Sequence, residues 1–383
     1  MTIWCELVWL QNSFQPATRI TLNEYSTIVQ IETHQQPHAG DKVFNGLVVP
    51  GFINAHCHLE LSHLQKKIPP KTGMAGFIER LQKIRNSATI QQKINSQLAA
   101  IQELKKNGVV AIADICNSDD SRFAKEQFPE IQFHHFIEIF GLSKDAAIHQ
   151  MNHASDLLKA FYNATITPHA PYSAGPELLR HTFQRAEAVY SIHLLESEEE
   201  KQLFEQQEGA LWELFSSWNL PVSQEFYQKD IIKHISQGLP NDASVLWVHN
   251  NYLTEKQIET IVHNFPNSYF CLCPRANMFI HNKFPEFSTF YSVRNRLCLG
   301  TDSLAGTTSF DLLADAKIIT DSNIFSLGEI INMLTINPAQ ALHWSPRLGS
   351  FEVGKSPGFN QLYPIQIENP RLLSCTGVQP IIV

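Results

Sequence analysis

Residues 50–58 read PGFINAHCH, an apolar run that breaks into a loop at two histidines, His56 and His58. Alternate side chains of an extended strand point to the same side, so an HxH pair at a strand end can place both imidazoles on one ion. Imidazole is a common ligand of divalent metals. An HxH pair can also simply cap a strand, so its meaning depends on the polar sites further along the chain.

Four more polar sites follow apolar, strand-like runs. They are Thr167-Pro168-His169, His193-Leu194-Leu195-Glu196, Val248-His249-Asn250 and Gly300-Thr301-Asp302. The active sites of (β/α)8 barrels lie at the carboxyl ends of the strands, so these side chains are expected to meet there. Any one of them could be a structural residue, but their recurrence at strand ends indicates a metal-dependent hydrolase.

Short apolar runs alternate with longer amphipathic stretches through most of the chain. The expected strands are Leu47–Asn54, Val109–Ile115, Gln132–Phe140, Ala164–Thr167, Tyr190–Leu194, Val245–His249, Tyr269–Cys273 and Arg296–Gly300. Strands that alternate with helices form parallel sheets. The pattern therefore predicts an α/β protein with a distorted (β/α)8 TIM barrel, whose final helix is Ser326–Leu342. A doubly wound open sheet is the alternative, but the first strand is not followed by a glycine-rich phosphate loop.

The two ends of the chain have a different pattern, with short strand-like pieces between polar turns. Neither end can bury enough surface alone. We therefore expect residues 1–46 and 346–383 to pair into a small β-sandwich domain, and residues 47–345 to form the catalytic barrel.

Composition narrows the class of protein. Of the 383 residues 43% are hydrophobic and 17% charged, which is typical of a globular chain with a large core. A formal charge of −8 argues against a nucleic-acid surface, and no apolar run is long enough to span a membrane. The first residues lack a secretion signal, and the seven scattered cysteines are typical of buried, reduced thiols. These features favour a cytoplasmic location.

The chain resembles the amidohydrolase superfamily, in the branch of nucleobase and nucleoside deaminases and chlorohydrolases. The matching segments are PGFINAHCH (50–58), TPHAPYS (167–173), HLLE (193–196), VHNN (248–251), CPRAN (273–277), LGTDS (299–303), NPAQAL (337–342) and RLGSFEVGK (347–355). This resemblance implies that His56, His58, His193 and Asp302 bind one divalent ion, zinc first, with iron or manganese as alternatives. No lysine stands at the end of the fourth strand, where binuclear relatives carry a carbamylated one, so a single ion is expected.

The resemblance also implies catalytic roles for Glu196 and His249, and a substrate contact for His169. A metal-bound hydroxide would attack the substrate while Asp302 accepts a proton. Glu196 would move a proton to a ring nitrogen, and His249 would orient the attacking group. Ammonia would then leave.

The substrate is expected to be a small heterocycle. PHAPYS resembles the adenosine-type deaminases, including those acting on S-adenosylhomocysteine and methylthioadenosine. The extension His58-Leu59-Glu60-Leu61-Ser62-His63 resembles deaminases of 6-aminodeoxyfutalosine, an adenine nucleoside of menaquinone biosynthesis. The alternatives are deamination of S-adenosylhomocysteine, adenosine or another amino-heterocycle, hydrolysis of a cyclic amide as in imidazolonepropionase, and a non-catalytic barrel that keeps a structural metal.

Three further residues are candidates for substrate binding. By analogy Glu60 lies near the substrate, although it could equally be a carboxylate in a solvated loop or at a helix cap. Arg275 could pair with a substrate carboxylate, or form a structural ion pair. Glu138 stands inside an apolar run and needs a partner if it is buried. The segment Ser62–Ser87 is expected to cover the site, and the resemblance makes a homodimer an option.

Overall fold

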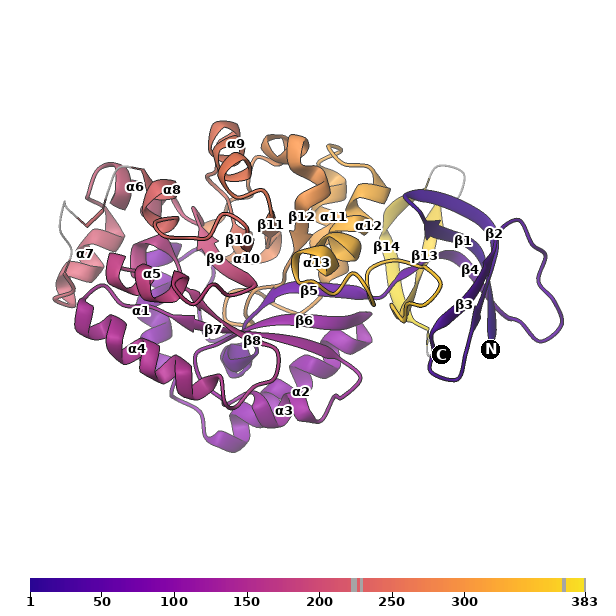
Figure 1. Cartoon of the computed structure of the whole chain (residues 1–383), viewed down its shortest axis with the longest axis horizontal. Helices are drawn as coiled ribbons and strands as arrows, with labels where there is room; N and C mark the ends of the chain where they lie inside the picture. Colours follow the sequence, from indigo (N-terminus) through magenta and orange to yellow (C-terminus); the bar gives the residue numbers. More distant parts are fainter. Residues whose placement is uncertain (222–225, 228–229, 367–369, 382–383) are drawn as a thin grey trace.

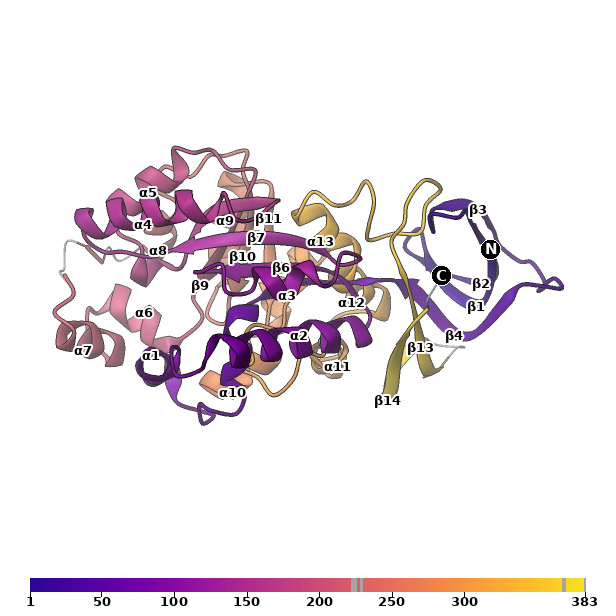
Figure 2. The same ribbon diagram turned by 90° about the horizontal axis from the view of Figure 1, so that it is seen from below.

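The computed structural model describes residues 1–221, 226–227, 230–366 and 370–381. The chain is elongated, with a barrel of strands and helices at one end and a separate sheet at the other (Figures 1 and 2). Both described ends of the chain lie in this separate sheet. No helix among the described residues is long and apolar enough to cross a membrane.

Eight parallel strands build the barrel in two four-stranded sheets, ordered β5-β6-β7-β8 and β12-β11-β10-β9. Their bounds are β5 (Phe52–Cys57), β6 (Val109–Cys116), β7 (Gln132–Ile139), β8 (Ala164–Pro168), β9 (Val189–Leu194), β10 (Ser244–His249), β11 (Ser268–Leu272) and β12 (Leu297–Leu299). Buried apolar residues dominate these strands, as expected where helices cover one face and the barrel core fills the other.

The two sheets touch at both seams without a continuous ladder. At the β8–β9 seam the His193 amide donates to the His169 carbonyl (2.9 Å), and Thr167 Oγ1 donates to the Ser191 carbonyl (2.6 Å). At the β12–β5 seam the amides of Thr301 and Asp302 both donate to the His56 carbonyl, at 3.0 and 3.1 Å. The strands therefore form the distorted (β/α)8 barrel that the sequence predicts.

Helices surround the barrel and follow the strands in the expected alternation (Figure 1). They are α1 (Gly73–Ile84), α2 (Ile90–Lys106), α3 (Arg122–Glu126), α4 (Lys144–Leu157), α5 (Pro176–Phe183), α6 (Glu198–Glu205), α7 (Ala210–Ser217), α8 (Ile231–Ile235), α9 (Glu255–Asn264), α10 (Pro274–His281), α11 (Leu312–Asp321), α12 (Leu327–Leu334) and α13 (Ile336–Ala341), with 3-10 helices η1 (Leu59–Leu64), η2 (Pro171–Ser173) and η3 (Phe287–Arg296).

The expected final helix Ser326–Leu342 is two helices, α12 and α13. They meet at Thr335, whose φ of −132° and ψ of −85° are not helical. Pro338 explains the break, because proline has no amide hydrogen and its ring would clash with the carbonyl of residue 334 in a continuous helix.

The expected first strand Leu47–Asn54 is also two elements, β4 (Lys42–Pro50) and β5, separated at Gly51. A Cβ on Gly51 would lie 2.4 Å from Val110 Cγ1 and 2.7 Å from the Pro357 carbonyl oxygen. Only glycine allows this close approach. The chain turns there from the terminal sheet into the barrel.

The terminal sheet has six strands in the order β14-β13-β4-β1-β2-β3. The other strands are β1 (Thr2–Leu10), β2 (Ser13–Leu22), β3 (Ile28–Glu32), β13 (Phe359–Gln366) and β14 (Arg371–Pro380). Hydrogen bonds join the strands from both ends of the chain into one sheet. The two ends join edge to edge, because β13 pairs antiparallel with β4, and the boundary expected after residue 46 falls inside β4.

Candidate active site

The predicted ligand residues converge at the carboxyl ends of strands from both halves of the barrel. His56 lies in β5 and His58 directly after it, and their Nε2 atoms face each other at 3.1 Å. Asp302 follows β12, and its Oδ1 is 3.6 Å from His58 Nε2 and 3.9 Å from His56 Nε2. His193, near the end of β9, has its ring centroid 4.8 Å from that of His56. The ligand atoms of His56, His58 and Asp302 lie within 4.8 Å of one another, and so do those of His56, His193 and His249, so that His56 belongs to both groups.

The protonation of these side chains suits a divalent cation. Burial lowers the pKa of His56 and of His58 well below the ordinary value, and neighbouring histidines lower it further. His193 Nδ1 donates to the His169 carbonyl (3.0 Å), which leaves the lone pair on Nε2. Neutral imidazoles and a carboxylate are the donor set of a zinc-type site, so the residues present fit one divalent ion. His249 also groups with His56 and His193 closely enough to act as a ligand.

Backbone strain is concentrated at these residues. Leu195, His249 and Asp302 have φ of 46°, 71° and 56°, in the left-handed region that side chains other than glycine rarely adopt. Gly300 lets the end of β12 approach β5, since a Cβ there would lie 2.7 Å from His56 Cβ. Strained backbone conformations therefore orient these side chains toward one place.

Glu196 and His249 lie side by side at the same end of the barrel. Glu196 Oε2 is 3.5 Å from His249 Nε2, and His249 Nδ1 donates to Asn277 Oδ1 (2.9 Å). Burial alone would raise the pKa of Glu196, but the charge of His249 and a hydrogen bond from His281 hold that pKa well below its ordinary value. The carboxylate is thus ionised near neutral pH.

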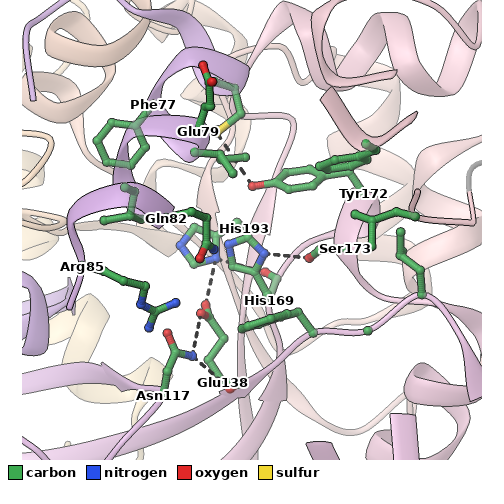
Figure 3. A pocket seen from close by; sticks show the side chains of 18 of the residues that line it. Phe77, Glu79, Gln82, Arg85, Asn117, Glu138, His169, Tyr172, Ser173 and His193 are labelled. Atoms are coloured by element: carbon green, nitrogen blue, oxygen red, sulfur yellow. Dashed lines mark hydrogen bonds and ion pairs between the residues drawn. The ribbon is translucent and has the colours of Figure 1, made fainter. Parts of the chain in front are cut away.

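A cavity of about 800 Å³ opens onto these residues. His58, His193, Glu196, His249 and Asp302 line its inner end. Its outer wall is largely apolar, with side chains from α1, α7 and the segment that follows α7; they include Phe77, Leu81, Phe215, Trp218 and Leu220. Figure 3 shows this cavity from close by.

His169 and Glu138 both line the cavity, as substrate-binding residues must. His169 Nδ1 hydrogen-bonds Ser173 Oγ (2.7 Å), and burial lowers the pKa of His169 to about 4. Glu138 accepts from Asn117 Nδ2 (3.1 Å) through Oε2, while its buried Oε1 has no hydrogen-bond partner in the described part of the chain and lies 3.5 Å from His193 Nδ1. Figure 3 shows Glu138 between Asn117 and His193.

The structure does not bring Glu60 or Arg275 to the cavity wall. Glu60 is buried in η1, where its Oε2 accepts from the amides of Asn117 (2.9 Å) and Ser118 (3.2 Å). The guanidinium of Arg275 is held by Thr308 Oγ1 (2.8 Å), Ser309 Oγ (2.8 Å) and the Ser309 carbonyl (3.0 Å). Glu60 is thus buried against loop amides and caps none of the described helices, whereas Arg275 also lies 4.0 Å from Asp315 Oδ2, as in the structural ion pair that the sequence allows for it.

Sequence reasoning missed two residues that the structure places at the site. Arg85 lines the cavity, with its guanidinium pointing toward Asn117 and Glu138 (Figure 3). Its Nη2 atom lies 3.8 Å from Glu60 Oε1, so Glu60 forms an ion pair with Arg85. His281, at the end of α10, donates from Nε2 to Glu196 Oε1 (3.1 Å). No spacing in the sequence marks either residue, because each reaches the site through the packing of a helix on the barrel.

A family model described as "Amidohydrolase family" matches residues 47–365, more than half of the chain. Among curated proteins, a 5-methylthioadenosine/S-adenosylhomocysteine deaminase of Caldicellulosiruptor saccharolyticus is 24% identical over 346 residues, which cover 83% of this chain and 73% of that protein.

Two solved structures share the fold over 94% of this chain. One is an aminofutalosine deaminase of Helicobacter pylori in complex with methylthio-coformycin, with a TM-score of 0.78, 20% identity and 91% of that chain covered. The other is an adenosine deaminase of Xanthomonas campestris with bound zinc, with a TM-score of 0.70, 16% identity and 83% of that chain covered. All three similar proteins are named as deaminases.

Proposed function

We propose that this chain, which belongs to the amidohydrolase family, is a metal-dependent hydrolase that deaminates an adenine-containing nucleoside. The observation that carries the proposal is the position of Glu196, an ionised carboxylate beside His249 and at the same cavity end as the His56, His58, His193 and Asp302 cluster. The names of the similar deaminases support the choice of an adenine nucleoside.

His56, His58, His193 and Asp302 would hold the divalent ion, with zinc as the first candidate because imidazole and carboxylate suit it. When bound, the ion supplies Lewis-acid activation of water. The similar adenosine deaminase structure with bound zinc supports that choice.

The chain's own residues then handle the protons. Glu196 takes one proton from the attacking water and delivers it to a ring nitrogen of the substrate, while His249, held by Asn277, orients the attacking oxygen. A carbon–oxygen bond forms at the amino-bearing carbon. Asp302 takes the second proton from the added hydroxyl group and passes it to the amine, the carbon–nitrogen bond breaks, and ammonia leaves a keto product.

Within this class we propose 6-aminodeoxyfutalosine as the first substrate, which would place the protein in menaquinone biosynthesis. The similar aminofutalosine deaminase supports it, and a cavity of about 800 Å³ has room beyond a purine base. His169 and Glu138 are the proposed contacts near the base and sugar. Arg85, and no longer Arg275, is the proposed partner of a substrate carboxylate, because Arg85 is the arginine that lines the cavity.

Replacing Glu196 by glutamine tests the chemistry. We expect Glu196→Gln to lower turnover by about 10²- to 10⁴-fold, the usual contribution of a general acid–base group, with metal content unchanged. Ammonia release and metal analysis of the same samples measure both. Glu198→Gln, an exposed residue of the same loop-to-helix segment, is the matched control. Near-normal activity of Glu196→Gln would refute the assigned mechanism.

A substrate panel tests the class. Zinc-loaded protein is assayed for ammonia release with 6-aminodeoxyfutalosine, S-adenosylhomocysteine, methylthioadenosine, adenosine, guanine and cytosine. We expect the first compound to have the highest kcat/KM. If no adenine nucleoside gave ammonia, the substrate proposal would be overturned. Ring amides would then be tested for hydrolysis without ammonia release.

A further inference from the structure

Two histidines flank the carboxylate of Glu196, one beside each oxygen. His249 Nε2 lies 3.5 Å from Oε2, and His281 Nε2 lies 3.1 Å from Oε1. The Glu196 main chain is fixed as well, because its amide donates to Glu200 Oε2 (2.9 Å) and its carbonyl accepts from Asn251 Nδ2 (2.8 Å). The side chain therefore has few ways to move, and His281 forms its shortest contact.

The two histidines are not equivalent as hydrogen-bond donors. A carboxylate only accepts, so His281 must carry its proton on Nε2. His249 already donates from Nδ1 to Asn277, so a neutral His249 has a lone pair and no proton on Nε2. Among the described residues, His281 is thus the side chain whose ring N–H donates a hydrogen bond to the Glu196 carboxylate.

His281 lies behind Glu196 as seen from the substrate. It is the last residue of α10, and its side chain is 4% exposed. The preceding Ile280 lines the cavity, whereas His281 does not. Asn282 ends the helix with a left-handed φ of 55°. His281 can therefore act on the reaction only through Glu196.

On the basis of the proposed function, we infer that His281 is a positioning residue that donates to Glu196 Oε1 and keeps the other oxygen turned toward the substrate. Without that donor a buried carboxylate would lose its hydrogen bond, which is costly, and would rotate or take up a proton. Either change withdraws the base from the water that it must deprotonate.

Two substitutions separate positioning from simple packing. His281→Leu keeps much of the volume and removes the donor, whereas His281→Gln keeps an N–H donor on a side chain of similar reach. We expect His281→Leu to lower kcat about 10²-fold, the scale of a misplaced catalytic group, with KM and metal content near wild type. His281→Gln should recover at least a tenfold part of the loss. His263→Leu, an exposed histidine of α9, is the control. Equal activity of His281→Leu and wild type, or no recovery in His281→Gln, would overturn the inference.

A second measurement does not depend on the substrate. In protein labelled with nitrogen-15 at histidine, and assigned with His281→Gln, the His281 ring should appear protonated at Nε2. Its signals should shift in Glu196→Ala, which removes the acceptor. Unchanged His281 signals in Glu196→Ala would overturn the inference whatever the enzyme acts on. A failure of the proposed function would be seen in a different experiment, in which wild-type protein releases no ammonia from the nucleoside panel.

Discussion

At the scale of single residues, Arg85 is the proposed determinant of which nucleosides the cavity prefers. Its guanidinium lines the cavity and points toward Asn117 and Glu138, and only Glu60 pairs with it among the described residues, at 3.8 Å. We expect Arg85→Gln to reduce kcat/KM about 10- to 100-fold for a nucleoside that carries a carboxylate, because hydrogen bonds to charged groups are worth about 1.5–3 kcal/mol. Adenosine, which has no carboxylate, should lose little.

Arg275→Gln is the matched control for that prediction. Its guanidinium is bound to Thr308 and Ser309 outside the cavity, so the ratio of kcat/KM between the two substrates should stay as in wild type. Steady-state kinetics of both variants with 6-aminodeoxyfutalosine and adenosine give the answer. An equal loss on both substrates in Arg85→Gln, or a larger change in Arg275→Gln, would contradict the assignment.

The same pair of arginines shows where sequence reasoning stops. The sequence predicts the positions of His56, His193 and Asp302, because each lies near the end of a strand with a recognisable apolar pattern. Arg275 also follows a strand, but the helix α10 that it begins turns its side chain toward Thr308 and Ser309. Arg85 comes directly after α1, and only the packing of that helix brings it to the cavity. Such tertiary placement has no spacing rule.

At the scale of elements, a buried ion pair connects β6 to α3, and its carboxylate also binds the start of η1. Lys125 Nζ lies 2.5 Å from Asp114 Oδ2, with side chains 4% and 0% exposed, and Asp114 Oδ1 accepts from the Leu59 amide (2.7 Å). Because Leu59 follows His58, this pair also fixes the backbone at the site. We expect Lys125→Met to destabilise the protein by about 3–5 kcal/mol, since it leaves a buried carboxylate without its partner.

Thermal unfolding of three variants checks this element. Lys93→Met breaks a more exposed pair, with Lys93 Nζ 2.7 Å from Asp120 Oδ2, and should cost less than about 1 kcal/mol. Adding Asp114→Asn to Lys125→Met should recover part of the lost stability, because the unpaired charge is then gone. If Lys125→Met and Lys93→Met unfolded at the same temperature, the buried pair would have no such role.

At the scale of elements, the sequence does not predict where one apolar run is divided between two strands. The alternation of apolar runs and amphipathic stretches predicts the barrel strands and most of its helices. It does not reveal that Gly51 splits one apolar run between two sheets, because the cause is contact with Val110 and Pro357, far along the chain. The single terminal sheet depends in the same way on the pairing of β13 with β4, which are more than 300 residues apart.

At the scale of the whole molecule, the candidate metal site joins the two halves of the barrel. His56 and His58 belong to the β5–β8 half, whereas His193 and Asp302 belong to the β9–β12 half. The strand ladders are interrupted at both seams between these halves, so few backbone hydrogen bonds hold them together there. An ion bound to all four side chains would be a cross-link between sheets.

This geometry predicts that metal binding stabilises the whole chain. An ion that binds only the folded state at a free concentration of 100 times its Kd adds about 2.7 kcal/mol. Chelation should therefore lower the unfolding temperature, and added zinc should restore it along with activity. His193→Ala should reduce the zinc-dependent shift in unfolding temperature, because it removes a ligand from one half. His38→Ala, which changes an exposed histidine before β4, should leave that shift unchanged. The measurement is the unfolding temperature of metal-free and of zinc-loaded protein. If the two temperatures were identical while activity still depended on metal, the site would perform chemistry without joining the halves.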